Sequence, residues 1–572
     1  MQLADRARAS RFGIPLAVAA AAVVAGFALS FGLNGYFAYL GVSVVVAAIA
    51  LLGLGVVTGS AGMISLCQLT FAAIGAWVVS ALNVAGAPGG FLFWLLLGGL
   101  AAGVVGVLIG LPALRLRGIN LAVVTLGLAA AADVTLVEIQ FPGTTDGVSV
   151  DRPSIVADDN SYFFLCILVL IVCALAVYFL RRGPWGSSWA AVAFSERGTA
   201  AAGASVRTAK LSAFAVSATL GGISGGLLTA QVGFAFPTSF APLQSLALYV
   251  LAIMSGAHLI DMAVFGALLW VAVPELLKRW GVPQDWGFVI FGLLGIQALA
   301  GRGNLGTAIR ELWRRRSKPT ASLNITTLGE EPAKLPPGEP VLTVRGLSVT
   351  FGNVKALSGV DLTVPKCGVL GVIGPNGAGK STLVDAISGF LPQAEGMVEL
   401  DGRLLDGPPT KRARSGLRRT FQQDRVPAGL TIEAYVRFVA RRRPPADEVA
   451  AALEFFGCPP ASTPLDRVDV GARRLVEVVG HLMARPQVLL LDEPAAGLPH
   501  EEHVAFGERL RQVPARFGVS VLIIEHDLDL VRSVCDTLTV LDFGQVLASG
   551  PQAEVLADPA VLKAYLGETE ML

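Results

Sequence analysis

Long apolar stretches dominate the first half of the chain, and most are close to the length of a membrane-spanning helix. About 20 helical residues cross the roughly 30 Å hydrocarbon layer of a bilayer. The stretches predict about ten spans, at residues 14–32, 36–57, 64–83, 91–112, 118–139, 162–181, 210–231, 243–257, 258–277 and 286–300. The short 243–257 stretch leaves open a re-entrant segment in place of one full span.

The second half has a different pattern, in which short β-rich runs alternate with helical patterns. The runs are Val341–Val344, Val369–Ile373, Val488–Leu491 and Val519–Ile524. This alternation predicts a parallel sheet covered by helices, with an antiparallel start over 341–366.

Between the two halves, residues 307–340 contain a basic stem followed by a Pro-, Thr- and Glu-containing stretch that ends in KLPPGEP. Such a composition is typical of a linker. We therefore predict a polytopic α-helical membrane domain over 1–306, a linker over 307–340 and an α/β domain over 341–572.

One predicted span is interrupted by small and polar residues, namely Gly59, Gly62, Ser65, Gln68 and Thr70. Irregular polar backbone at membrane depth is tolerated where it is buried in protein or lines a cavity. Broken helices of this kind often form substrate sites in transporters. Close helix packing through small residues explains the same pattern equally well.

The composition agrees with a chain that lies partly in the hydrocarbon of a membrane and partly in water. Hydrophobic residues make up 53% of the sequence and charged residues 15%, whereas a soluble chain carries about 25% charged residues. The deficit lies before residue 306. The net charge of +1 excludes a nucleic-acid partner, and the six cysteines contain no CxxC pair that would indicate a metal or disulfide framework.

The distribution of charge predicts the orientation in the membrane. Basic residues gather in the loops that ten spans would place on the side of the two termini, at Arg115, Arg117, Arg181, Arg182, Arg197, Arg207 and Lys210 and after the last span. The 140–160 loop is acidic, and only Lys278 and Arg279 fall on the wrong side. By the positive-inside rule, both termini and the α/β domain lie in the cytoplasm.

The strongest chemical signal is a phosphate-binding loop directly after the apolar strand 369–373. The segment fits GxxxxGK[ST] with Gly374, Pro375, Asn376, Gly377, Ala378, Gly379, Lys380, Ser381 and Thr382. Glycines allow backbone N–H groups to surround the phosphates of ATP, and the following helix adds positive potential at its N-terminus. In this motif Lys380 meets the β- and γ-phosphates, and Ser381 ligates Mg²⁺.

Two later strands end in further candidate catalytic residues. The run VLLLDEP delivers Asp492 toward Mg²⁺ and places Glu493 where it can polarise the attacking water. His526 follows the strand 519–524 and can contact the γ-phosphate.

With these motifs the 341–567 segment resembles the ATP-binding cassettes of ABC transporters. The sequences LLLDEPAAGL, IIEHDLDLV and VLDFGQVLASGPQAEVLADPAVLKAYLG more particularly resemble the ATPase subunits of branched-chain amino acid importers. The resemblance implies that Phe351 stacks on adenine, that Gln422 is the Q-loop glutamine and a further Mg²⁺ ligand, and that Ala495–Leu498 is the D-loop.

The signature loop departs from this family pattern. In the family this loop has a sequence close to LSGGQ and binds the γ-phosphate held by the opposing cassette. The corresponding residues here are Val468–Ala472. Gly471 is retained, but Asp469 replaces the serine. A carboxylate repels a phosphate unless it turns away or caps the following helix, so the two ATP sites of a cassette dimer are not expected to be equivalent.

Residues 36–306 resemble a permease subunit of the same importers, through VTGSAGMISLCQLTFAAIGAW, LRLRGINLAVVTLG and TTDGV among others. Within this region the 182–209 loop resembles the coupling helix that docks beside the Q-loop, with a solvated connector as the alternative. The family further implies a second permease and a second ATPase as homologous subunits of a hetero-oligomer, and an extracytoplasmic solute-binding protein.

The sequence therefore predicts a multi-pass protein of the cytoplasmic membrane that fuses a permease and an ATPase and imports branched-chain amino acids or a related small polar solute at the expense of ATP. Urea, amides and aromatic acids remain alternative substrates within the family. An exporter and a membrane ATPase without a transport role are the rivals from other classes.

Overall fold

The computed structural model describes residues 2–300 apart from Arg115 and Arg117, the single positions 304, 306 and 308, and residues 339–566 apart from Asp424 and Gly497. The predicted 307–340 linker lies almost wholly outside the described residues. The chain divides into two compact units, one of Met1–Trp189 with Arg207–Lys318 and the other of Ala190–Val206 with Pro319–Leu572.

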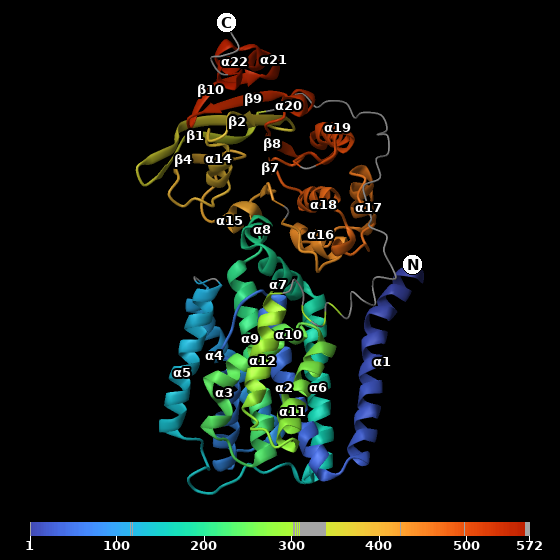
Figure 1. The fold of residues 1–572 in the computed structure, drawn as a ribbon. Coiled ribbons are helices and arrows are strands. Elements are labelled where there is room, and N and C mark those ends of the chain that lie inside the picture. Colours follow the sequence, from blue (N-terminus) through green and yellow to red (C-terminus); the bar gives the residue numbers. More distant parts are fainter. Residues whose placement is uncertain are drawn as a thin grey trace. The chain divides into compact units, whose positions relative to one another are not determined.

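The first unit is a bundle of apolar helices (Figure 1). Its helices are α1 (Gln2–Gly32), α2 (Gly35–Gly55), α3 (Gln68–Val84), α4 (Gly90–Ala113), α5 (Ile119–Ile139), α6 (Asp159–Arg182), most of α7 (Pro184–Phe194), α9 (Val206–Val232), α10 (Pro242–Ser255), α11 (Ile260–Arg279) and α12 (Trp286–Ala300), with short turns η1 (Val56–Ser60), η2 (Ser154–Val156) and η3 (Pro237–Phe240). Among the described residues, eight helices are long and apolar enough to span a membrane, and two more are apolar but shorter.

The two helices that are too short to span a membrane differ from the short stretch that the sequence indicated. The 243–257 stretch is extended at its start by η3, so that Pro237–Ser255 reaches spanning length. The two that fall short are Gln68–Val84 and Trp286–Gln297. The first is short because the chain leaves the helix between η1, a π-helical turn, and Gln68, with Gly62 at a φ of +67°.

The C-terminal part of the interrupted segment is packed in protein, whereas Gly59 and Gly62 are exposed. The Gln68 side chain is fully buried, and its Nε2 donates to the carbonyls of Ala50 (3.2 Å) and Ser217 (3.1 Å). The Ser217 hydroxyl in turn donates to Gln68 Oε1 at 2.9 Å. The one amide therefore ties the end of the break to α2 and α9, as the packing interpretation predicts for this part of the segment.

Glycines bring α3 and α9 into backbone contact. A Cβ placed on Gly75 would lie 2.1 Å from the carbonyl oxygen of Gly222, and one on Gly225 would lie 1.8 Å from that of Ala72. Neither distance leaves room for a side chain. Small residues at such crossings allow the close van der Waals contact that holds helices together in lipid.

The second unit is the predicted α/β domain with both of its sheets (Figure 1). A four-stranded antiparallel sheet has the order β2-β1-β4-β5, and a six-stranded sheet has the order β10-β9-β3-β8-β7-β6, parallel except for β10. The strands are β1 (Pro340–Phe351), β2 (Val354–Pro365), β3 (Val369–Ile373), β4 (Glu395–Leu400), β5 (Arg403–Leu404), β6 (Leu417–Arg419), β7 (Val488–Asp492), β8 (Ser520–Ile524), β9 (Thr537–Asp542) and β10 (Gln545–Pro551).

Helices complete this unit, and one of them comes from the permease half of the sequence. They are α8 (Glu196–Ala201), α14 (Lys380–Ile387), α15 (Pro409–Arg414), α16 (Ile432–Ala440), α17 (Ala446–Phe455), η4 (Leu465–Arg467), α18 (Val470–Leu482), α19 (His500–Phe517), α20 (Leu528–Val534), α21 (Gln552–Ala557) and α22 (Pro559–Leu566).

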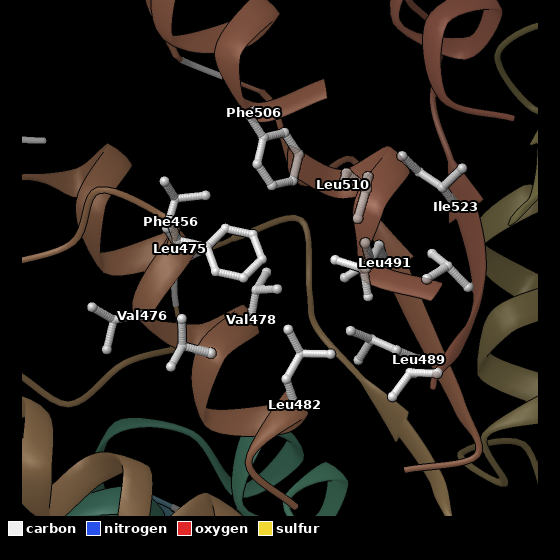
Figure 2. Close-up of a cluster of buried hydrophobic side chains, with 14 of the residues drawn as sticks. Phe456, Leu475, Val476, Val478, Leu482, Leu489, Leu491, Phe506, Leu510 and Ile523 are labelled. Carbon is white, nitrogen blue, oxygen red and sulfur yellow. The ribbon is translucent and has the colours of Figure 1, made fainter. Parts of the chain in front are cut away.

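The central strands are buried on both faces. Because alternate side chains of a strand point to opposite sides of the sheet, each such strand contributes to two hydrophobic clusters. In β7, Leu489 and Leu491 join one hydrophobic cluster, and Val488 and Leu490 join the other. Figure 2 shows the first cluster, in which the β7 leucines face Leu482 of α18 and side chains of α19. This two-sided burial explains why the sequence of β7 is a continuous apolar run.

We expect Gly75→Ala to destabilise the membrane unit, because the added methyl group would meet the backbone of Gly222 and push α3 from α9. Overpacking of this kind costs about 1–3 kcal/mol. The amount of folded protein in detergent and its melting temperature should both fall. Gly127→Ala is the matched control, since a Cβ at this helical glycine meets nothing within 4 Å; equal behaviour of the two variants would contradict the packing argument.

Candidate nucleotide-binding and hydrolysis site

The phosphate loop joins β3 to α14 and has the backbone shape that its glycines predict. Gly377 and Gly379 adopt φ angles of +86° and +100°, which side-chain-bearing residues rarely adopt. A Cβ on Gly379 would also lie 2.7 Å from the Ala356 carbonyl of β2. The loop therefore needs glycine here both for its turn and for its contact with the β1–β2 hairpin, which also carries the half-exposed ring of Phe351.

Lys380 extends back along this loop. Its ammonium group donates to the carbonyls of Gly374 (2.6 Å) and Pro375 (2.9 Å). Burial lowers the pKa of Lys380, while the nearby negative charges of Glu493 and Asp492 act in the opposite direction. The hydroxyl-bearing residue Ser381, next in the first turn of α14, is exposed.

Asp492 ends β7 and is almost completely buried. Burial raises the pKa of its carboxyl group, and the positive charge of Arg419 opposes that shift. Arg419, at the end of β6, donates to Asp492 Oδ2 at 3.0 Å and also pairs with Asp385 of α14. Arg419 could not be identified from the sequence, because no local pattern shows which carboxylates a strand-end arginine will meet.

Glu493 and Gln422 come together although 71 positions separate them. Gln422 Nε2 donates to Glu493 Oε2 at 2.7 Å. The Glu493 backbone has a φ of +45°, a region that is unusual for a glutamate, and its N–H donates to the Ile524 carbonyl at 3.0 Å. Arg474 of α18 donates to the carbonyl of Glu493 (3.2 Å) and to that of Gln422 (2.6 Å), so this arginine, also missed from sequence, links the two loops.

His526 lies at the same edge of the sheet, with its side chain 65% exposed and its Nδ1 3.8 Å from Glu525 Oε2. Glu525 itself is buried, and burial raises its pKa to about 7. Its Oε1 accepts from the backbone N–H of Ala495 at 3.3 Å. Glu525 thus connects the segment around His526 with the D-loop, a role that the sequence motifs do not indicate.

The divergent signature loop uses its carboxylate as a helix cap. Asp469 is the N-cap of α18, and its Oδ1 accepts from the N–H of Ala472 at 2.6 Å. Gly471 packs against Leu498, and a Cβ there would meet that side chain at 2.8 Å. A second acid, Glu502, lies close by, and its pKa is raised by burial and by the negative charge of Asp469.

The permease-derived residues 190–206 dock beside the Q-loop. Ser195 caps α8, accepting from the N–H of Gly198 at 3.0 Å. The Arg197 guanidinium lies over the rings of Phe390 (4.7 Å) and Phe421 (5.6 Å), and it pairs with Asp385 at 2.5 Å. Since Phe421 directly precedes Gln422, these contacts favour the coupling-helix interpretation over a solvated connector.

Comparisons with known proteins match the two halves of the sequence to a permease and to an ATPase. Residues 36–299 match the family model of the branched-chain amino acid transport system permease component. Residues 357–496 match that of ABC transporters, and residues 545–570 match that of the branched-chain amino acid ATP-binding cassette transporter.

Individual relatives match the ATPase half. The high-affinity branched-chain amino acid transport ATP-binding protein BraF of Pseudomonas aeruginosa is 35% identical over 256 residues, which cover 40% of this chain and 98% of BraF. The corresponding LivG protein of Escherichia coli K12 is 31% identical over 252 residues, which cover 40% of this chain and 99% of LivG. A probable LivG of Methanocaldococcus jannaschii is 33% identical over 256 residues, which cover 40% of this chain and 98% of that protein.

We expect Glu493→Gln to lower ATP hydrolysis at this chain's site by about 10²–10⁴-fold, since an amide cannot accept the proton of the attacking water. ATP binding should persist, because glutamine keeps the side-chain shape beside Gln422. The measurement is single-turnover hydrolysis alongside ATP binding in the assembled transporter. Glu454→Gln, at an exposed position of α17, is the control; full turnover by Glu493→Gln with the partner site disabled would refute the assignment.

Proposed function

Since the chain belongs to the branched-chain amino acid ABC transporter family and carries both its permease and its ATPase, we propose that it imports a branched-chain amino acid or a related small polar solute. The observation that carries this proposal is the docking of residues 190–206, part of the permease-matching region, beside Gln422 in the ATPase unit. A contact of this kind is what ATP-driven movement of a permease requires.

The orientation in the membrane is part of the proposal. Residues 190–206 pack with the ATPase, so the loop that contains them lies on the ATPase side of the membrane. Basic residues are concentrated in and around this loop, which supports the cytoplasmic side. Lys278 and Arg279 remain the exception to the charge rule.

At the nucleotide site, the proposed roles follow from the geometry. The positive-φ glycines shape a loop whose backbone N–H groups would surround the phosphates, and Lys380 adds its charge to the loop. Ser381, Gln422 and Asp492 carry the oxygen atoms that would ligate Mg²⁺, and the bound ion would neutralise phosphate charge. Glu493 would accept a proton from the attacking water, and His526 would contact the γ-phosphate.

The proposed assembly contains more than this chain. In cassette dimers each ATP lies between the phosphate loop of one subunit and the signature loop of the other. By family resemblance, a second permease and a second ATPase complete the complex, and a solute-binding protein delivers the substrate from outside. The acidic signature loop of this chain fits an assembly of homologous rather than identical subunits. The partner would then supply a signature loop of its own to the ATP that is bound at the phosphate loop of this chain.

Transport by the complete complex in proteoliposomes tests this proposal. We expect ATP-dependent accumulation of labelled leucine, isoleucine or valine on the side of the ATPase, stimulated by the solute-binding protein. Lys380→Ala is the control, since it removes the charge that meets the phosphates. Movement of solute away from the ATPase side would instead indicate an exporter. Hydrolysis that no solute or binding protein alters would indicate an ATPase without a transport role.

The acidic signature loop generates a separate prediction. Asp469→Ser should preserve α18, because serine and aspartate are comparable N-caps. It should leave ATPase activity unchanged or raise it, since it removes a negative charge from the loop that faces the partner's ATP. Asp469→Ala, which also removes the charge but loses the cap, should cost about 1 kcal/mol of stability. A collapse of steady-state ATPase activity in Asp469→Ser, with α18 intact, would show that the carboxylate itself is needed.

A further inference from the structure

A cavity of about 410 Å³ lies inside the membrane unit. Its walls come from α2, α3, α9, η3, α10 and α11, and aliphatic side chains together with Phe240 and Trp270 form much of them. Small-molecule sites typically have volumes of about 300–1,000 Å³ and combine an apolar lining with a few polar groups. The polar side chains that line this cavity are Ser43, Ser224, Ser239, Gln244, Glu275 and Gln284.

Glu275 is the one ionisable residue among the described residues that line the cavity. Both of its hydrogen bonds fall on the same oxygen: Oε1 accepts from the Tyr36 hydroxyl at 2.6 Å and from Arg279 Nε at 3.0 Å. Within the described part of the chain, Oε2 accepts no hydrogen bond. Tyr36 and Arg279 therefore fix the carboxylate in place and leave one oxygen available to a ligand.

Hydrogen-bond donors for the other end of a ligand are also present. The hydroxyls of Ser43 and Ser224 already donate to backbone carbonyls, and Gln244 donates to the Thr238 carbonyl. The side chains of Ser239 and Gln284 form no hydrogen bond with the rest of the described chain. These two groups can therefore donate to a carboxylate or carbonyl of a bound solute.

The polar groups gather toward one end of the bundle. Ser43 lies in the first half of α2, Ser239 in η3 just before α10, Glu275 in the second half of α11 and Gln284 in the connection to α12. In the proposed orientation α1 leaves the cytoplasm, so α2 begins and α11 ends at the extracytoplasmic side. The cavity then lies where an imported solute would enter.

We propose that this cavity binds the transported solute and that Oε2 of Glu275 accepts a hydrogen bond from its ammonium or amide N–H group. This inference rests on the proposed importer function and narrows its substrate. An α-amino acid fits best, with its ammonium at Glu275, its carboxylate toward Ser239 and Gln284, and its side chain against the apolar wall. An aromatic or aliphatic acid without an N–H group could not donate to Oε2 and would leave this oxygen unpaired, since Arg279 and Tyr36 bond only to Oε1.

Competition for uptake by the complete transporter in proteoliposomes tests the assignment. Leucine is the transported probe, isoamylamine is a competitor that lacks the carboxylate, and isocaproate is a competitor that lacks the amine. The wild type should be inhibited by isoamylamine and not by isocaproate. Glu275→Gln should raise the KM for leucine about tenfold or more, as expected when the acceptor of a charge-assisted hydrogen bond loses its charge, and should abolish the competition by isoamylamine.

Matched variants separate this role from a structural one. Glu275→Asp keeps the charge and should retain competition by isoamylamine, and Glu138→Gln, at an exposed position of α5 outside the cavity, should behave as wild type. An unchanged KM in Glu275→Gln, or stronger competition by isocaproate than by isoamylamine in the wild type, would overturn the cavity assignment alone. If no amino acid or amide accumulates in the presence of ATP in the wild type, the proposed function fails, and the role of the cavity fails with it.

Discussion

Arg419 lies almost completely buried between two carboxylates, Asp385 of α14 and Asp492 of β7. Removing one member of a buried ion pair leaves an uncompensated charge, which costs about 3–5 kcal/mol. The arginine therefore fixes the strand end that carries the proposed Mg²⁺ ligand relative to the helix that follows the phosphate loop. Asp385 also pairs with Arg197, so the same set of charges reaches from the permease-derived helix to Asp492.

The parts of the site that depend on local sequence could be predicted. Glycines at fixed spacing after an apolar strand specify the phosphate loop, and the continuous apolar run before Asp492 specifies a strand buried on both faces. Arg419, Arg474 and Glu525 could not be predicted, because their roles depend on partners tens of positions away. The capping role of Asp469 was foreseen only as one of two options, since a sequence does not show in which direction a side chain points.

The membrane unit shows the same limit in another form. Apolar length located its helices, but the pattern could not decide whether the interruption at Gly59–Thr70 lines a cavity or packs against neighbours. The contacts of Gln68 support packing for the end of this segment. A cavity of the same unit is lined by Leu69 of this segment and by residues such as Glu275. Glu275 lies in an otherwise apolar helix, and an ionisable residue in such a helix is itself a signal of function.

The contact between residues 190–206 and the ATPase is intramolecular in this chain. Between separate subunits it would be a binding equilibrium, and its occupancy would fall on dilution. Covalent connection replaces the concentration of a free partner by an effective concentration set by the connecting chain. The permease part of each chain therefore contacts the ATPase of the same chain. A homologous ATPase added in solution would not readily displace it from this contact.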